Sequence, residues 1–488
     1  MLLGLDLGTS SVKALLMGED GSPLGEGSAP YPVMAPRPGW AESSPEDWWS
    51  AVLEAADAAV GRRGAGVKAV GLSGQMHGVV LTDARGLPLR PAILWADARS
   101  GAELAAYRAL DGDLRLRLAN PPAVGMAGPS LLWLRDNEQD EYTSARWALQ
   151  PKDWLRMRLT GEIGAEPSDA SATLLYDLPA DDWSYPAIEA LGLRAELLAP
   201  LIPSAVVGGT LAGEAAGELG LGEGLPVAAG AADTAAAMLG AGLLRPGPVQ
   251  LTVGTGGQIV TPKESPDPDP RLRTHLYRGA GPGLWYSMAA IQNAGLALEW
   301  VRTVLGVSWE EVYEEAFAVP PGAGGVVFLP YLSGERSPRF DPGARGAWTG
   351  LGLDNTRGHL LRAALEGVAF ALREGLEALE DLGITAPELR LAGGGASGGP
   401  GGSGDPWRQL LADVLGRPLW LLRDEISSVA SARGAALLAG LASGVYSAAE
   451  DTLPLTPAPE RSVRPGEAGE DYGAAYERYK ELYPRLYG

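Results

Sequence analysis

The chain opens with Leu2-Leu-Gly-Leu-Asp6-Leu-Gly8-Thr9-Ser10-Ser11-Val-Lys13-Ala-Leu-Leu-Met17. Two apolar runs flank Gly-Thr-Ser-Ser, a pattern that predicts a strand, a tight turn and a second strand. The turn offers backbone N–H groups and hydroxyls, which suit phosphate oxygens. Asp6 ends the first strand, and a carboxylate beside a phosphate calls for a divalent cation between them, usually Mg²⁺. An ordinary hairpin whose turn is capped by Asp6 is the alternative.

A second stretch repeats this pattern: Leu251-Thr-Val-Gly254-Thr255-Gly256-Gly-Gln-Ile-Val260. It contains an apolar strand, a Gly-Thr pair, small residues and another apolar strand. The two Gly-Thr pairs lie close to half the chain length apart. We therefore infer two similar α/β lobes, each presenting a glycine-threonine hairpin to one central cleft. Two hairpins that face each other could hold a polyphosphate from both sides.

Length and composition exclude several classes of protein. The chain has 488 residues, a net charge of −21, three histidines and no cysteine. The length predicts two domains. The acidic charge argues against general binding to nucleic acid or anionic membranes. The lack of cysteine excludes disulfides, thiolate zinc sites and cysteine nucleophiles, and the scattered histidines argue against a histidine-rich metal site.

The remaining features of the chain concern its location and its division into domains. Asp6 interrupts the apolar start and no basic region precedes it, so we expect no signal peptide. No uncharged apolar run is long enough to span a membrane, and a cytoplasmic location is expected. The turn residues Arg245-Pro-Gly-Pro248 predict a boundary between an N-terminal domain, 1–245, and a C-terminal domain, 246–488. A helix of small residues over 428–441 is expected to complete the second domain.

Asp233 is the first candidate for catalysis. It follows a buried strand in Gly-Ala-Ala-Asp233-Thr-Ala-Ala-Ala, among side chains too small to block a substrate. A carboxylate at the carboxyl end of a strand faces the crevice in which α/β sheets bind ligands. There it could accept a proton from a hydroxyl that attacks a phosphoryl group. The alternative is an N-cap role for the helix that follows, and both roles can hold at once.

Two further segments carry polar side chains after strands. Leu72-Ser-Gly-Gln75-Met76-His77-Gly is a glycine-bracketed loop in which His77 could hydrogen-bond a polyol, although these residues alone favour a structural histidine. Ile93-Leu-Trp-Ala-Asp97-Ala-Arg99-Ser reads as a strand that leads into a helix. Asp97 and Arg99 could contact a ligand or could simply begin that helix.

A glycine run at 393–404 admits three interpretations. Gly393, Gly395 and Gly398 match G-x-G-x-x-G after a strand, which would suit a dinucleotide. Gly395-Ala-Ser397-Gly-Gly also matches a nucleophile elbow, but every histidine lies upstream of Ser397, so the hydrolase order fails. A glycine platform that lets an adenine approach the backbone is the third interpretation. A P-loop is excluded because G-x-x-x-x-G-K-[ST] does not occur.

Taken together, these segments resemble the FGGY carbohydrate kinases, in the superfamily that includes actin and the actin-like chaperone ATPases. The resemblance spans nearly the whole chain and also rests on Phe328-Leu-Pro-Tyr-Leu-Ser-Gly-Glu335-Arg336. Within the family the sequence is most similar to the xylulokinases, chiefly through Ser73-Gly-Gln-Met-His77-Gly. The resemblance implies two ribonuclease H-like lobes of the actin/hexokinase type. The sequence departs from the family at 398–404, where extra glycines lengthen a link that is usually short.

The resemblance also implies roles for individual residues. The first domain would bind the sugar and carry the general base, Asp233, and the second domain would bind the nucleotide. Asp6 would support catalysis, and Asp6 and Asp233 would hold Mg²⁺, partly through water. Sugar contacts are expected from Gln75, Met76, His77, Asp97, Arg99 and Asp233. Contacts to ATP are expected from Gly8, Thr9, Ser10, Ser11, Lys13, Gly254, Thr255, Gly256, Gln292, Gly295, Gly394, Gly395 and Ala396.

We therefore expect an ATP- and Mg²⁺-dependent kinase that converts D-xylulose to D-xylulose 5-phosphate. Its expected partners are a ketose and ATP, with no nucleic acid or membrane, and a homodimer is a candidate assembly. One alternative is another FGGY substrate, such as ribulose, fuculose, gluconate or glycerol. The others are an actin- or chaperone-like nucleotide switch without a sugar site, and a dinucleotide dehydrogenase built on 393–398.

Overall fold

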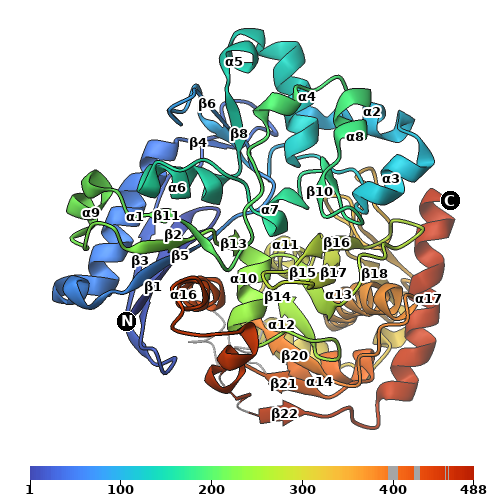
Figure 1. The fold of residues 1–488 in the computed structure, drawn as a ribbon. Helices are drawn as coiled ribbons and strands as arrows, with labels where there is room; N and C mark the ends of the chain where they lie inside the picture. Colours follow the sequence, from blue (N-terminus) through green and yellow to red (C-terminus); the bar gives the residue numbers. More distant parts are fainter. Residues whose placement is uncertain (394–404, 423–428, 457, 460) are drawn as a thin grey trace.

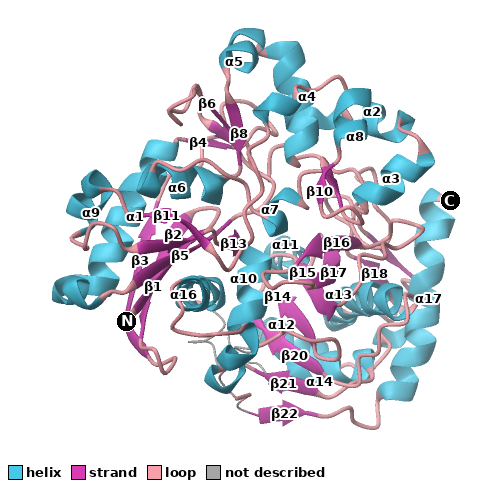
Figure 2. Cartoon of the chain, viewed as in Figure 1, coloured by secondary structure: helices cyan, strands magenta, loops and turns pink. Residues whose placement is uncertain are grey.

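The computed structural model describes residues 1–393, 405–422, 429–456, 458–459 and 461–488. These residues form two α/β lobes, each built around a seven-stranded mixed sheet. Figures 1 and 2 show the two sheets, with a group of helices from the first half of the chain above them. The two-lobed α/β architecture predicted from the sequence is therefore confirmed.

The first sheet begins with the predicted hairpin. Its strand order is β11-β12-β5-β1-β2-β3, and β13 also pairs with β5. β1 is antiparallel to β2 and parallel to β5. The strands are β1 (Leu2–Leu7), β2 (Ser11–Met17), β3 (Pro23–Pro30), β5 (Ala69–Gly74), β11 (Val207–Thr210), β12 (Pro226–Ala228) and β13 (Ala231–Ala232).

The second sheet repeats this arrangement. Its order is β16-β17-β15-β14-β20-β21-β22, with β14 antiparallel to β15 and parallel to β20. β14, β15, β17, β20 and β21 thus occupy the places of β1, β2, β3, β5 and β12. The strands are β14 (Val249–Val253), β15 (Gly257–Lys263), β16 (His275–Arg278), β17 (Trp285–Ile291), β20 (Leu389–Ala392), β21 (Leu419–Leu421) and β22 (Arg461–Val463).

Helices surround the two sheets and form half of the region 101–200, which was predicted to be mainly helical. They are α1 (Pro45–Val60), α2 (Leu104–Ala109), α3 (Gly112–Leu118), α4 (Ala127–Asn137), α5 (Gln139–Ser144), α6 (Pro151–Thr160), α7 (Pro167–Ala170), α8 (Tyr185–Ala190), α9 (Gly213–Leu219), α10 (Asp233–Gly240), α11 (Gly295–Leu305), α12 (Trp309–Phe317), α13 (Arg357–Glu380), α14 (Asp405–Leu415), α16 (Ala430–Ala442) and α17 (Gly469–Tyr487).

Short strand pairs and 3₁₀ turns complete the described structure. The pairs are β4 (Glu42–Ser43) with β7 (Ala92–Ile93), β6 (Val80–Thr82) with β8 (Trp147–Leu149), β9 (Tyr176–Asp177) with β10 (Asp182–Trp183), and β18 (Val327–Leu329) with β19 (Ala347–Thr349). The 3₁₀ turns are Gly61–Gly66, Arg99–Gly101, Ala195–Leu197, Ala323–Gly325 and Ala449–Leu455. Within the described ranges, no helix combines the length and the apolar character needed to cross a membrane.

The small-residue helix α16 packs on the first sheet, although it belongs to the second half of the chain. Figure 1 shows it between β1, β5 and α10. A Cβ on Gly4 would lie 1.9 Å from the carbonyl oxygen of Ala432, and one on Gly71 would lie 1.8 Å from that of Ala435. The helix that was expected to complete the second lobe therefore also covers the first sheet. Bare glycine backbone on the sheet lets the helix lie against it.

The helix α10 packs against α16 through the same kind of contact. A Cβ on Gly434 of α16 would lie 1.8 Å from the carbonyl oxygen of Ala236 in α10. One buried apolar cluster joins residues of β1, α10 and α16 with Val260 of β15 and Met288 of β17. The two helices therefore form a shared core between the lobes. The domain boundary at 245 stays a prediction, and this shared core crosses it.

A second connection between the lobes runs through β16. Asn120 donates from Nδ2 to the carbonyl oxygen of Leu276 at 2.9 Å and accepts the N–H of the same residue at 3.1 Å. Leu276 is 1% exposed and packs into the apolar core of the first lobe. The edge strand of the second sheet is thus fixed to the first lobe by both its backbone and its side chain.

Replacing Gly71 with alanine tests the contact of α16 with the sheet. We expect Gly71→Ala to reduce the free energy of unfolding by about 1–3 kcal/mol, because the new methyl group meets backbone atoms that cannot turn away. Gly217→Ala is the control, since this exposed glycine in α9 has open space at its Cβ position. Urea denaturation of both variants measures the effect, and equal stabilities would contradict the contact.

Candidate active site

Asp6 lies at the end of β1, in the ladder position opposite Lys13 of β2. Its Oδ1 accepts a hydrogen bond from Ser73 Oγ at 3.0 Å. Burial raises the pKa of Asp6, and the hydrogen bond from Ser73 and the charge of Lys13 oppose this effect. The hairpin turn follows directly, and the N–H of Gly8 donates to the carbonyl oxygen of Ser11 at 3.1 Å.

Asp233 is the first residue of α10, and Ala232 occupies the N-cap position. The capping alternative therefore does not describe this carboxylate. Its Oδ1 accepts the N–H of Thr234 at 2.5 Å and the Thr234 hydroxyl at 3.1 Å. In the part of the chain that the structure describes, Oδ2 has no hydrogen-bond partner. Burial, followed by the charge of Asp6, raises the pKa of Asp233 to about 7.

Both carboxylates line one cavity of about 260 Å³ between the lobes. From the first half, Asp6, Gly8, Asp233 and Thr234 contribute to its walls. From the second half, the lining includes Thr252, Gln258, Gly393 and Ser431. The structure thus brings the two predicted catalytic residues together. A pKa near 7 suits a general base that works at neutral pH, since both protonation states are then accessible.

The second hairpin, Gly254–Gly256, lies against the start of α11. The N–H of Gly295 donates to the carbonyl oxygen of Gly254 at 2.9 Å, and that of Leu296 donates to Thr255 at 3.0 Å. Among the described residues these hairpin glycines are not part of the cavity lining, whereas Thr252 and Gln258 on either side are. Gly394, Gly395 and Ala396 lie outside the described residues.

The predicted sugar contacts Met76 and His77 follow β5 directly. The Sδ atom of Met76 accepts a hydrogen bond from Tyr286 Oη at 3.8 Å. His77 has a φ of 72° and its Nδ1 lies 2.7 Å from the carbonyl oxygen of Ala172. A carbonyl only accepts, so Nδ1 carries the proton and Nε2 is an acceptor. Burial lowers the pKa of His77 to about 4, so the ring is neutral at pH 7.

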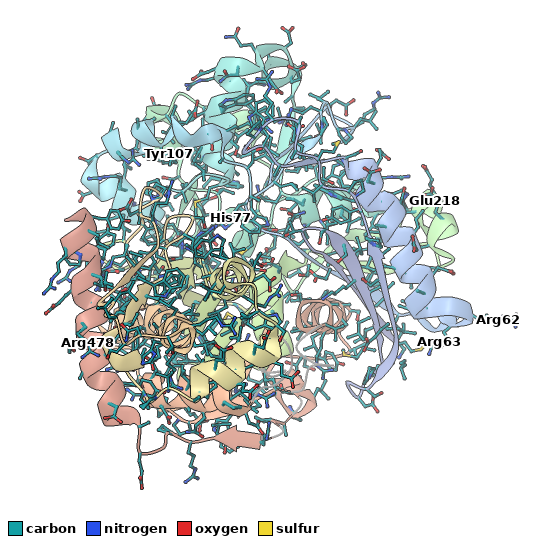
Figure 3. All side chains as sticks on the ribbon, turned by 180° about the vertical axis from the view of Figure 1, so that it is seen from behind. Arg62, Arg63, His77, Tyr107, Glu218 and Arg478 are labelled. Carbon is teal, nitrogen blue, oxygen red and sulfur yellow. The ribbon has the colours of Figure 1, made fainter. Side chains whose placement is uncertain are left out.

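His77 lies near the centre of the molecule (Figure 3), and Arg336 of the second lobe is close enough to affect its pKa. The charge of Arg336 helps to lower the pKa of His77, and its guanidinium lies 5.7 Å from the ring centroid of Trp95. Arg336 also lines a second cavity of about 190 Å³ together with Gln292 and Glu335. Gln292, predicted to contact the nucleotide, therefore lies at this second cavity.

Gln75 has a different environment from its two neighbours. It is 1% exposed, and its Nε2 donates to the carbonyl oxygen of Gly8 at 3.3 Å and to Tyr31 Oη at 3.2 Å. The same Tyr31 hydroxyl also donates to the Gly8 carbonyl oxygen. Gln75 thus stabilises the first hairpin through its hydrogen bond to the carbonyl oxygen of Gly8. Thr9 of that hairpin accepts a hydrogen bond from Trp95 Nε1 at 2.8 Å.

The prediction that Asp97 and Arg99 contact the sugar requires a correction, because both side chains bind other groups inside the protein. Asp97 accepts the N–H of Ala41 at 2.6 Å and the Arg99 Nε and Nη2 groups at 2.9 and 2.8 Å. Arg99 also pairs with Glu42 at 2.7 Å and lies 3.5 Å from the ring centroid of Trp40. Both side chains are 1% exposed. They are therefore closed off from direct contact with a sugar.

Sequence analysis missed three residues of the site region: Trp95, Thr234 and Arg336. Each stands inside a quoted motif, and Thr234 directly follows a residue that was chosen, Asp233. Thr234 was not chosen because it acts indirectly, by donating hydrogen bonds to Oδ1 of the neighbouring Asp233. Trp95 and Arg336 join the site through partners far away in the sequence, a hydroxyl of the first hairpin and the ring of Trp95, so local patterns carry no signal for them.

The two carboxylates fit a Mg²⁺ ion. Mg²⁺ in phosphate-transfer sites is usually held by one or two carboxylates together with substrate phosphates. Asp6 and Asp233 repel each other across one cavity, and a cation would relieve this repulsion. The described residues contain no group of three or more acidic, histidine or cysteine side chains that could hold a metal alone. The donor set therefore suits an ion that arrives with a phosphate.

Comparison with known proteins gives consistent results over both halves. Residues 1–240 match the model of the N-terminal domain of the FGGY family of carbohydrate kinases, and residues 249–443 match that of its C-terminal domain. A xylulose kinase of Escherichia coli (strain K12) is 35% identical over 489 residues, covering 100% of this chain and 98% of the relative. A gluconokinase of Bacillus subtilis (strain 168) is 30% identical over 429 residues, 85% of this chain and 82% of the relative.

A solved structure agrees with these matches. The crystal structure of a "xyloylose kinase" from Brucella ovis superimposes with a TM-score of 0.90 at 37% identity, covering 99% of each chain. The similarity therefore extends over the complete two-lobed architecture as well as over the sequence.

The environment of His77 can be tested by NMR. We expect His77 to keep its proton on Nδ1 and to titrate with a midpoint of about 4, because burial disfavours the charged ring. Long-range ¹H–¹⁵N correlation spectra from about pH 3 to pH 8 report both properties. The chain has three histidines, so the spectrum of His77→Gln assigns the signal. A midpoint near 6.5, or a proton on Nε2, would contradict the described environment.

Proposed function

The chain belongs to the FGGY family of carbohydrate kinases, and from that premise we propose that it transfers a phosphoryl group from ATP to D-xylulose. The product is D-xylulose 5-phosphate. Xylulose kinases are similar to this chain over its full length, which supports the choice of sugar. In this proposal the domain 1–245 binds the sugar and carries the base, and the domain 246–488 binds the nucleotide.

One observation carries the proposal: Asp233 and Asp6 line the same cavity as Gly8 of the first hairpin and Thr252 and Gln258, which flank the second. The sugar hydroxyl attacks the terminal phosphorus of ATP, and its proton passes to Asp233 Oδ2 as the new O–P bond forms. ADP leaves as the bond to its oxygen breaks. Thr234 holds Oδ1, so the carboxylate keeps one orientation while Oδ2 accepts the proton.

Phosphate binding is assigned to backbone amides and small polar side chains. The first hairpin contributes Gly8, Thr9, Ser10 and Ser11, with Lys13 beside Asp6. The second contributes Gly254, Thr255 and Gly256, with Gly295 behind it. Asp6 and Asp233 would hold Mg²⁺, which would neutralise charge on the phosphates when bound. The acidic chain then needs no large basic patch to accept ATP.

Sugar recognition is assigned to the loop after β5. Neutral His77 presents Nε2 as a hydrogen-bond acceptor, which suits a hydroxyl of an uncharged polyol. Met76 offers a polarisable apolar surface beside it. Gln75 acts indirectly, through its hydrogen bond to Gly8. These roles leave the hydroxyl to be phosphorylated near Asp233.

Gluconate is the second candidate substrate. A gluconokinase is 30% identical over 85% of this chain, and Arg336 lies close enough to His77 to influence its pKa. A guanidinium at this position could pair with a carboxylate on the sugar. Two observations argue against gluconate: burial lowers the pKa of Arg336 itself, and its guanidinium already lies near the ring of Trp95. We therefore favour the uncharged ketose.

Substitution of Asp233 tests the proposed base. We expect Asp233→Asn to reduce kcat by about 10²–10⁴-fold, the usual contribution of general acid–base catalysis, while ATP still binds. Asp57→Asn, a change at an exposed aspartate of α1, serves as the control and leaves turnover intact. ADP release and calorimetric titration with ATP measure the two properties. Near-normal turnover of Asp233→Asn would remove this residue from the role.

A substrate panel tests the choice of sugar. ADP release is measured with Mg-ATP and D-xylulose, ribulose, fuculose, glycerol or gluconate, together with a blank that contains no sugar. We expect the highest kcat/KM with D-xylulose. A preference for gluconate would support the second candidate and the role of Arg336. Turnover that does not depend on any sugar would point instead to a nucleotide switch.

A further inference from the structure

A buried carboxylate, Glu166, lies at the start of α7 in the first lobe. Its side chain is 0% exposed and accepts the N–H groups of Ser168 and Asp169 at 2.9 and 3.2 Å. It also accepts the hydroxyls of Ser168, at 2.6 Å, and Ser204. Four donors thus fix both of its oxygens. None of these contacts involves the cavity described above.

Ser168 and Ser204 connect Glu166 to the segment that precedes Asp233. The Oγ atom of Ser168 accepts the N–H of Ala232 at 2.8 Å. The carbonyl oxygen of Ser204 accepts the N–H of Gly230 at 3.1 Å. Glu166 therefore holds residues 230–232 from two sides. This segment consists of Gly230 and the strand β13 (Ala231–Ala232), after which the chain turns into α10, where Asp233 begins the helix.

A buried lysine supports the same assembly. Lys152 is 0% exposed, and its Nζ lies 2.7 Å from Asp153, 3.4 Å from Asp169 and 3.8 Å from Glu166. Its aliphatic stem packs behind the turn, since a Cβ on Gly230 would lie 3.0 Å from Lys152 Cδ. Charges that are so deeply buried are costly unless they are paired, and removing one partner is strongly destabilising.

Few hydrogen bonds from other parts of the chain hold Asp233 itself. Thr234 holds its Oδ1, but it follows in the chain and moves with the helix. Ser431 of α16 donates to the backbone carbonyl of Asp233 at 3.3 Å. β13 adds two residue pairs with Ser73 and Gly74. The hydrogen bond from Ala232 to Ser168 thus adds a completely buried contact with another element, one residue before Asp233.

We propose that Ser168, held in place by Glu166, is a positioning residue for Asp233. This inference rests on the proposed function, in which Asp233 accepts the proton. Catalytic groups must be held within fractions of an ångström, and a displacement of about 1 Å can cost as much as 10²-fold in rate. Without the Ser168 hydroxyl, the N–H of Ala232 has lost its acceptor and the turn can shift. Ser168 then affects the chemical step without contacting the substrate.

The test compares Ser168→Ala with Ser168→Thr, using Mg-ATP and the sugar that is preferred in the panel. We expect Ser168→Ala to lower kcat by about 10- to 100-fold, whereas the KM for ATP changes by less than about threefold. Ser168→Thr keeps a hydroxyl and restores most of the loss. Ser184→Ala is the matched control, because this serine is 1% exposed and its hydroxyl has no partner among the described residues.

A double variant separates positioning from general damage to the fold. If Ser168 acts through Asp233, adding Ser168→Ala to Asp233→Asn lowers kcat no further. Independent losses that multiply would overturn the proposal, as would a normal kcat for Ser168→Ala. Should Ser168→Ala fail to fold, Glu166→Gln replaces it, because an amide oxygen and an amide nitrogen cannot satisfy four donors. An unchanged kcat in that folded variant overturns the proposal equally.

The outcome of Asp233→Asn distinguishes this inference from the proposed function. If that variant keeps its turnover, the base assignment fails and the positioning role fails with it. If Asp233→Asn is inactive and Ser168→Ala is fully active, only the positioning role fails. Both the base assignment and the positioning role are supported if Asp233→Asn is inactive, Ser168→Ala is slow and Ser168→Thr keeps most of the activity.

Discussion

The structure depends on the close approach of two helices of small residues to the first sheet. Because Gly4 and Gly71 have no side chains, the backbone of α16 lies directly on β1 and β5. Gly434 allows α10 to lie equally close to α16. These contacts draw the start of α10 toward the end of β1, which is where Asp233 and Asp6 stand. The cavity between the lobes exists because glycine and alanine occupy these positions.

This arrangement places two acidic side chains close together at the cavity. Two other buried carboxylates are closely paired, Asp97 with Arg99 and Glu166 with four hydrogen-bond donors. Asp6 and Asp233 instead face each other across a cavity, and burial and mutual repulsion raise the pKa of Asp233 to about 7. A cation or a proton relieves this repulsion, which is the behaviour that phosphoryl transfer requires.

Local patterns predicted the parts of the fold that depend on neighbours in the sequence. Strand, turn and strand at Gly8 and at Gly254 follow from apolar runs around small residues, and their repetition predicted two lobes. The position of α16 could not be predicted in this way, because it depends on glycines in strands more than 350 residues earlier. Asp97 and Arg99 were misjudged for the same reason, since Trp40, Ala41 and Glu42 enclose them from a distant segment.

The buried charges around Glu166 raise the question of why the first lobe does not use an apolar core there. Replacing such a network with hydrophobic residues is often neutral or stabilising, so stability alone does not explain it. An apolar core would hold the segment 230–232 by shape, whereas hydrogen bonds donated to Ser168 and Ser204 hold individual backbone N–H groups. Directional bonds fix position more sharply than packing does. The network is therefore best explained by the precision that Asp233 needs at the start of α10.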